Sequence, residues 1–297
     1  MIAVNGIILI LSCQKHLDTR IKNFKLPKND YGGWKVIYVI GDLFLDCDYK
    51  FISSGSSAGA SEAHEAHFAD FLIIKCEDSY IHLLKKLVLS LKYLYETFDI
   101  KEGVLRSGDD LIYDEELLQA FLDSPKKRML CGSSGSDGSD SSGSVLTDLD
   151  FYGKSPAGRS LLSHEISDAD IKSTTNDSFM VNYYAGHQED FNNPQHNLAG
   201  VNIAKYMKRP HIPVGPAGIL YYISNKSCAI LINHLNSINY NIFHYDEKTD
   251  SYPYTIEDCA VSFILYSNKI GFIHYPKMYG DYNRDTDVIA IHTNIYK

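Results

Sequence analysis

The sequence predicts a single α/β domain whose central sheet is mixed but mostly parallel and is flanked by helices. Short β-branched apolar runs alternate with helical patterns through the first 130 residues, which is typical of βαβ units. Hydrophobic residues make up 44% of the 297-residue chain, enough for a substantial core. Neither an internal repeat nor a Pro-rich linker interrupts the chain, so one domain, 1–297, is favoured over two.

The predicted strands of the first half are short apolar runs bounded by polar segments. They are Gly6–Leu11, Val36–Ile40, Phe71–Lys75, Val104–Arg106 and Met129–Cys131. Between the third and fourth runs, residues 79–98 repeat leucine at helical spacing, which predicts a long amphipathic helix. Residues 1–131 are therefore expected to form a nucleotide-binding half.

Residues 132–197 are predicted to be a variable, flexible segment. Its first part, 132–144, reads GSSGSDGSDSSGS and offers no apolar side chain for burial. This run contains neither GxSxG nor GxxxxGK[ST], so it is neither a serine-hydrolase elbow nor a P-loop. The rest of the segment is polar and poorly patterned.

Residues 198–297 are predicted to form a second organised half. A glycine-containing turn within 213–224 leads into a strand. Helices are expected from about residue 226 and about residue 255, and final strands near Phe272 and Ile289.

Charge and cysteine usage exclude several classes of protein. The formal net charge is −9 and the longest basic run is Lys126–Arg128, which argues against a nucleic-acid partner. The six cysteines form no CxxC motif, which predicts free thiols in a reducing compartment. The apolar run Ile7–Leu11 is too short to span a bilayer. We therefore expect a soluble, cytoplasmic protein with no transmembrane segment.

Two adjacent carboxylates, Asp109 and Asp110, follow the strand predicted at Val104–Arg106. Open α/β sheets bind ligands at the carboxyl ends of their strands. Two carboxylates there can hold a hard divalent cation that keeps water and phosphate oxygens as its other ligands. The pair therefore predicts a site for a metal ion and a phosphorylated substrate.

Further motifs precede and include this pair in a recognisable order. A polar turn at Ser12, a helix containing Arg20 and a second strand ending at Gly41 come first. Next come Glu65, Phe68, Ala69 and Asp70 before the third strand. An Asp-x-Tyr motif at Asp78, Ser79 and Tyr80 follows, with a leucine-rich helix that contains Leu83 and Lys86. The last match is Arg106-Ser107-Gly108-Asp109-Asp110. In order and spacing this region resembles the β1,3-glycosyltransferase family, which includes β1,3-galactosyl- and N-acetylglucosaminyltransferases and Fringe. The resemblance implies a GT-A-like fold, that of nucleotide-diphospho-sugar transferases.

The resemblance also implies roles for the matching positions. Asp110 occupies the place of the family's acid that touches Mn²⁺ (or Mg²⁺), and Asp109 would face the ribose or sugar of the donor. Glycine at 108 replaces the first acid of the family's motif. The implied donor-binding residues are Ser12, Arg20, Asp78, Lys86, Arg106 and Asp109, with Gly215 and Gly218 in the second half.

Two more implied roles fall near the C-terminus. Glu257-Asp258 resembles the start of the family's Glu-Asp-Val motif, which makes Asp258 the catalytic general base. A late histidine completes the metal site in several family members, and His292 is preferred here over His274. The implied reaction is inverting transfer of a hexose, N-acetylhexosamine or pentose from a UDP-sugar donor to a hydroxyl of a glycan acceptor, forming a β-linkage.

Two other functions stay open at this point. The same Asp-Asp pair and metal would serve a nucleotidyltransferase or another phosphosugar enzyme. Because Gly108 replaces an acid and several family aromatics are missing, the chain could instead be a non-catalytic carbohydrate- or nucleotide-binding protein of the same fold. Neither the donor sugar nor the acceptor can be read from the sequence.

Overall fold

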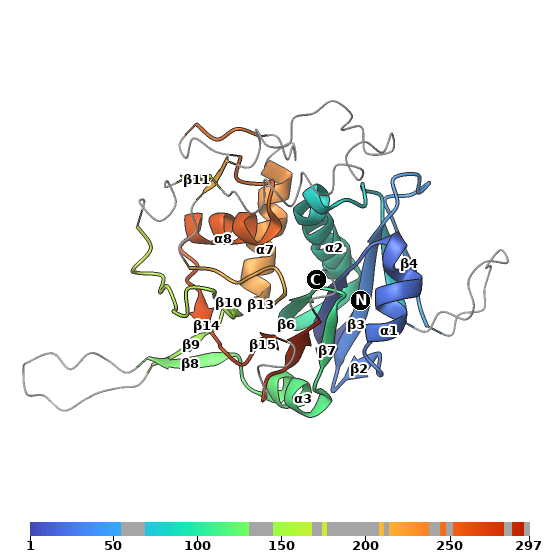
Figure 1. The fold of residues 1–297 in the computed structure, drawn as a ribbon, viewed down its shortest axis with the longest axis horizontal. Helices are drawn as coiled ribbons and strands as arrows, with labels where there is room; N and C mark the ends of the chain where they lie inside the picture. Colours follow the sequence, from blue (N-terminus) through green and yellow to red (C-terminus); the bar gives the residue numbers. More distant parts are fainter. Residues whose placement is uncertain are drawn as a thin grey trace, which may run out of the picture.

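The structure is a computed structural model that describes residues 1–54, 69–130, 145–167, 174–176, 208–210, 214–237, 244–247, 252–281 and 287–293. Within these ranges the chain is an α/β protein built on one large mixed sheet (Figure 1). The predicted α/β class is therefore confirmed.

The large sheet has the strand order β14-β10-β13-β6-β1-β3-β5-β4, and β2 pairs with β3. Its strands, in chain order, are β1 (Ile2–Leu11), β2 (Asp30–Tyr31), β3 (Trp34–Gly41), β4 (Tyr49–Ile52), β5 (Asp70–Ile74), β6 (Phe98–Ser107), β10 (Phe151–Gly153), β13 (Leu220–Ser224) and β14 (Ile273–His274). Because β13 from the second half pairs with β6 from the first, the two predicted halves share this sheet.

The centre of the sheet is parallel, as predicted for the first half. β6, β1, β3 and β5 run side by side in the same direction. Residues Ile7–Leu11 and Val36–Ile40 are all buried, because helices or loops cover both faces of these strands. The flanking strands β13 and β4 are antiparallel to their neighbours, so the whole sheet is mixed.

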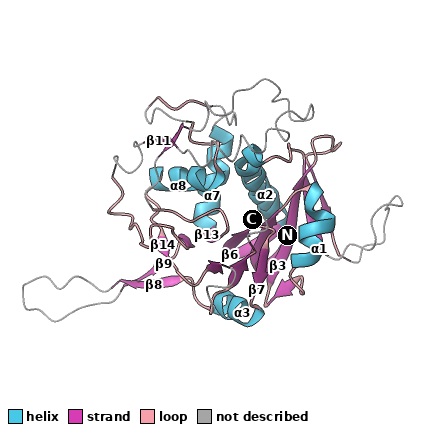
Figure 2. Cartoon of the chain, viewed as in Figure 1, coloured by secondary structure: helices cyan, strands magenta, loops and turns pink. Residues whose placement is uncertain are grey.

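Alternate residues of the strands enter two separate hydrophobic cores. Ile7 and Leu9 face the core formed with α2 (Leu83–Thr97), α7 (Asn225–Ser237) and α8 (Glu257–Ser267). On the other face, Ile8 and Ile10 pack in the core that includes α3 (Glu115–Asp123). Figure 2 shows α2, α7 and α8 grouped together and α3 well apart from them.

Short elements complete the described chain. After β1 come η1 (Gln14–His16), η2 (Leu17–Ile21) and α1 (Lys22–Phe24), and η3 (Tyr80–His82) leads into α2. A small sheet of order β15-β16-β7 joins β7 (Leu111–Tyr113), β15 (Tyr279–Asp281) and β16 (Ala290–His292). A further two-stranded sheet pairs β11 (Thr174–Asn176) with β12 (Lys208–Pro210). The small sheet of β7, β15 and β16 brings the end of the chain beside the residues that follow Asp110.

Two expectations about the middle of the chain need correction. The run predicted at Met129–Cys131 does not join the large sheet, since β8 (Lys127–Leu130) pairs antiparallel with β9 (Val145–Asp148) in a sheet of their own. Two consecutive strands can pair in parallel only when a long crossover, usually a helix, connects them. The Gly/Ser/Asp run between β8 and β9 has no helical pattern in its sequence, so antiparallel pairing is the expected arrangement. The segment predicted to be flexible also contributes β10, because Phe151 is fully buried against Phe272 and Tyr221. Residues 132–144 lie outside the described residues.

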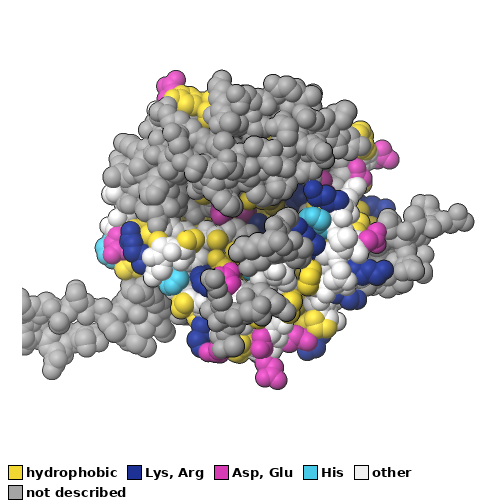
Figure 3. Space-filling view, viewed as in Figure 1, with side chains coloured by type: hydrophobic (Ala, Val, Ile, Leu, Met, Phe, Trp, Pro, Cys, Tyr) yellow, Lys and Arg dark blue, Asp and Glu magenta, His cyan; other side chains and the backbone are white. Residues whose placement is uncertain are grey.

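Three further observations concern the chain as a whole. No helix in the described ranges is long and apolar enough to cross a membrane. Free thiols are present, as predicted, at Cys13, Cys47, Cys76, Cys228 and Cys259, whereas Cys131 is outside the described residues. Acidic and basic side chains are interspersed over the described part of the face in Figure 3.

Candidate functional site

The candidate site is built at the carboxyl end of β6. This strand ends at Ser107, and Asp109 and Asp110 follow with exposures of only 9% and 8%. Buried carboxylates need partners, because an isolated charge is costly to remove from water. The partners of the two acids define the site.

Asp109 is held by three side chains from the segment after β1. Its Oδ2 accepts hydrogen bonds from Ser12 Oγ at 2.6 Å and lies 2.7 Å from His16 Nδ1, and its Oδ1 accepts from Arg20 at 3.1 Å. Burial alone would raise the pKa of Asp109, but the hydrogen bonds from His16 and Ser12 and the Arg20 charge outweigh it, so the pKa is lowered. The residue is therefore an anion at neutral pH.

The predicted donor residues Ser12, Arg20 and Asp109 are thus brought together, and His16 joins them. Arg20 also lies 3.7 Å from Asp110 Oδ2, so its guanidinium spans both acids. Sequence reasoning missed His16. The available signal was its position in the polar turn that follows a buried parallel strand, where ligand-binding side chains are expected.

Lys86 and Asp78 contact the backbone of the turn after β1 rather than the two acids. The ammonium of Lys86, on α2, is 2% exposed and donates to the Ser12 carbonyl at 2.7 Å as well as to Asp78. The other oxygen of Asp78 accepts from the Gln14 amide at 2.8 Å. Both residues therefore fix the backbone that carries Ser12, His16 and Arg20.

Asp110 meets His292, the preferred histidine of the sequence prediction. His292 Nε2 lies 3.3 Å from Asp110 Oδ2. The pairing of β16 with β7 brings them together, and Thr293 donates to the Asp110 carbonyl from its amide at 3.1 Å and its hydroxyl at 2.9 Å. His274 is occupied elsewhere, since its Nδ1 accepts from the Ser155 amide at 3.0 Å.

The donor chemistry of Asp110 and His292 fits a metal ion that is bound together with a phosphorylated ligand. Across the described ranges, with their gaps, no three His, Cys, Asp or Glu side chains form a group that could hold a metal. Mg²⁺-type ions in nucleotide sites need only one or two carboxylates, because phosphate oxygens and water fill their other positions. At such a site Asp110 would supply the carboxylate and His292 a nitrogen donor.

Glycine at position 108 has a local reason. A Cβ at Gly108 would lie 3.0 Å from Asp110 Oδ1, closer than nearly all real contacts of a Cβ atom. A side chain there would press on the carboxylate that faces His292. An acid at position 108 would therefore require the Asp110 carboxylate to shift from this placement.

Gly218 and Asp258, from the second half of the chain, are connected to the Asp109–Asp110 pair through backbone hydrogen bonds. The Gly108 amide donates to the Ile219 carbonyl at 2.9 Å, and the Gly218 amide donates to Asp258 Oδ2 at 2.9 Å. Asp258 lies in the first turn of α8 and is half-buried, whereas its neighbour Glu257 is 6% exposed. Of the two acids, Asp258 is the more exposed.

Two predicted donor residues are placed differently from the rest. Arg106 is 3% exposed, and its guanidinium donates to Glu257 and to the Gly218 carbonyl. Its described contacts are therefore with the protein interior. The Gly215 amide donates to Ser155 Oγ at 3.5 Å, and among the described residues no contact connects it to Asp109, Asp110 or Asp258.

Comparison with protein-family models and with curated proteins identified no relative of this chain. No protein-family model matches the sequence, and no curated protein matches it closely enough to be identified as similar. The functional interpretation therefore depends on the geometry of the site and on the motif resemblance.

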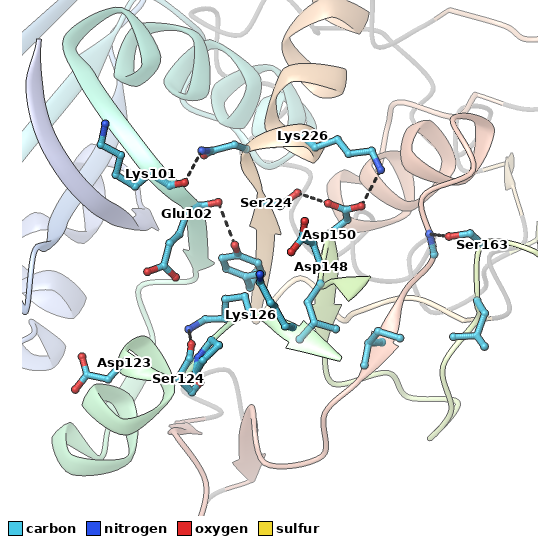
Figure 4. Close-up of a pocket in the computed structure, with 18 of the residues that line it drawn as sticks. Lys101, Glu102, Asp123, Ser124, Lys126, Asp148, Asp150, Ser163, Ser224 and Lys226 are labelled. Carbon is cyan, nitrogen blue, oxygen red and sulfur yellow. Dashed lines mark hydrogen bonds and ion pairs between the residues drawn. The ribbon is translucent and has the colours of Figure 1, made fainter. Parts of the chain in front are cut away.

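A hollow of about 1110 Å³ lies at the end of the strands opposite the acid pair, where β6 begins and β13 ends (Figure 4). Three of the lysines that line it are bound to the protein itself. Lys226 pairs with Asp150 at 2.9 Å and Lys101 pairs with Asp99. Lys126 donates to the carbonyls of Phe121, Leu122 and Ser124 at the end of α3. The Lys226–Asp150 pair connects the first turn of α7 to the residue before β10, and the Lys126 contacts stabilise the end of α3, so we assign these residues to stability.

Replacing Lys126 by methionine should lower the free energy of unfolding by about 1–3 kcal/mol, because carbonyls at the end of α3 lose their donor. The ammonium also lies 4.5 Å from the centre of the Phe121 ring, so a cation–π contact is lost. Urea denaturation would measure the change. Lys127→Met is the matched control, since the Lys127 side chain is exposed and should contribute less than about 0.5 kcal/mol. Equal losses in both variants would contradict this role for Lys126.

Proposed function

We propose that this protein is a metal-assisted, inverting glycosyltransferase that moves a sugar from a UDP-sugar to a hydroxyl of a glycan. The main support is the contact between Asp110 and His292 at 3.3 Å. These two residues are far apart in the sequence, and the motif resemblance implies both as metal ligands. Their contact lies at the carboxyl end of a parallel strand, where nucleotides bind in open α/β sheets.

The donor would bind along the turn after β1. Arg20 spans Asp109 and Asp110, so it holds the two neighbouring carboxylates in position. Asp109, held by Ser12 and His16, presents a fixed acceptor to hydroxyls of a ribose or sugar. An ion held by Asp110 and His292 would neutralise charge on a UDP leaving group.

Asp258 would act on the acceptor. An acceptor hydroxyl must lose its proton as it attacks the anomeric carbon, and a positioned carboxylate takes that proton. Both oxygens of Asp258 are oriented by backbone amides, from Gly218 at 2.9 Å and Cys259 at 2.7 Å. Attack on the side opposite the departing nucleotide inverts the anomeric configuration and gives a β-linkage from an α-linked donor.

A nucleotide-sugar screen tests this proposal. UDP-, GDP- and dTDP-sugars would be assayed for nucleotide release and thermal shift, each with Mn²⁺ and with EDTA. Metal-dependent release or stabilisation with a UDP-sugar is expected. Release of a nucleotide product without free or transferred sugar would favour a nucleotidyltransferase. No response to any nucleotide sugar would reject the transferase and favour a carbohydrate-binding protein.

A further inference from the structure

A buried ion pair connects β6 to the first turn of α8. Arg106, on β6, lies 3.0 Å from Glu257 Oε2, and the two residues are only 3% and 6% exposed. We infer that this Arg106–Glu257 pair positions Asp258 through Gly218. Because the inference takes Asp258 as the base, it rests on the proposed function.

The contacts form a continuous path from the ion pair to the base. Arg106 donates to the Gly218 carbonyl as well as to Glu257. The amide of the same glycine donates to Asp258 Oδ2 at 2.9 Å. A shift of the guanidinium would therefore move the residue that orients the Asp258 carboxylate.

Glu257 itself cannot reorient without breaking other contacts. Its Oε1 accepts a hydrogen bond from the Tyr221 hydroxyl, while its Oε2 faces Arg106. A Cβ on Gly218 would lie 3.3 Å from Glu257 Oε2 and 3.5 Å from Asp258 Oδ2. Glycine at this position thus lets both carboxylates approach the same stretch of backbone.

Stability alone is a poor explanation for such a pair. Burial would lower the pKa of Arg106, but the Glu257 carboxylate beside it outweighs this and raises the pKa, so the guanidinium is charged. Removing two charges from water is costly, and apolar residues of similar volume often stabilise a protein as well or better. Here the pair occurs between the strand that leads to Asp110 and the helix that carries Asp258. This location indicates a positioning role.

Glu257→Gln tests the inference, because it keeps the shape of the side chain and removes its charge. With a donor that the wild type turns over, kcat should fall about ten- to a hundredfold while the donor KM stays unchanged. Asp70→Asn is the matched control. Asp70 is 3% exposed, compared with 6% for Glu257, and it is likewise paired with a cation, Lys35 at 3.3 Å, but it lies on β5. This control should keep the wild-type kcat.

A double variant separates positioning from a general loss of structure. In the Asp258→Asn background, Glu257→Gln should cause no further loss of kcat, because the base it positions is already gone. A loss of the same factor in both backgrounds would overturn the inference, as would a normal kcat in Glu257→Gln itself.

The hydrogen-exchange rate of the Gly218 amide tests the positioning role without an activity assay. NMR should find this amide protected in the wild type and exchanging faster in Glu257→Gln, with Asp70→Asn unchanged. Unchanged exchange in Glu257→Gln would also overturn the inference. If the wild type processes no nucleotide sugar, the proposed function fails and the base role fails with it. If the wild type is active and Glu257→Gln behaves normally, only the positioning role fails.

Discussion

Replacing Asp258 by asparagine is expected to lower kcat for sugar transfer by about 100- to 10,000-fold, the usual contribution of a general base. The donor KM should stay unchanged, because among the described residues the contacts join Asp258 to the acid pair indirectly, through Gly218, Ile219 and Gly108. Steady-state kinetics with varied donor would measure both quantities.

The same variant should lose a little stability, and this cost needs a control. An asparagine has one acceptor oxygen, so it cannot satisfy the amides of both Gly218 and Cys259, at a cost of about 1 kcal/mol. Glu116→Gln is the matched control, because Glu116 is the second residue of α3 as Asp258 is of α8. It removes an equivalent charge from a helix N-terminus and should leave kcat unchanged. If Asp258→Asn also kept its kcat, another group would have to be the base.

Replacing Asp110 by asparagine should remove the dependence on metal. An ion at a leaving group contributes several kcal/mol, so the loss of its carboxylate should lower kcat/KM by about a hundredfold or more. The residual activity should be the same in Mn²⁺ and in EDTA. Nucleotide release in the two conditions would measure this.

Asp109→Asn distinguishes metal binding from a general loss of charge in the acid pair. Asp109 faces Ser12, His16 and Arg20, whereas Asp110 faces His292. The Asp109 variant should therefore weaken donor binding and still respond to Mn²⁺. An Asp110 variant that keeps its full response to metal would contradict the assigned roles.

The parallel core was predictable from the sequence because each of its strands is an apolar run of the right length. The strand at 36–40 and the helix at 79–98 were found with small errors at their ends, where propensity is weakest. The pairing of β8 with β9 and the presence of β10 in the large sheet were not predicted. Both depend on tertiary pairing, which short runs such as Phe151–Gly153 do not reveal by periodicity.

Motifs marked Asp109, Asp110 and Asp258 in the sequence, and the structure places the first two after β6 and the third in the first turn of α8, while their roles stay predictions. Their partners were harder to predict. His16 lies in a turn without a recognisable pattern, and Arg106 looks like a donor ligand until Glu257 is found beside it. Such contacts join residues distant in the sequence, and no local rule predicts which buried charges will pair.

The central claim is that Asp110 and His292 hold a metal ion together with a nucleoside diphosphate. Titration of Mn²⁺ followed by electron paramagnetic resonance of the free ion tests it directly. UDP should increase the affinity of the wild-type protein for Mn²⁺, UMP should increase it less, and Asp110→Asn should lose most of the effect. Binding of Mn²⁺ that is unaffected by UDP, or that is equal in wild type and Asp110→Asn, would contradict the claim.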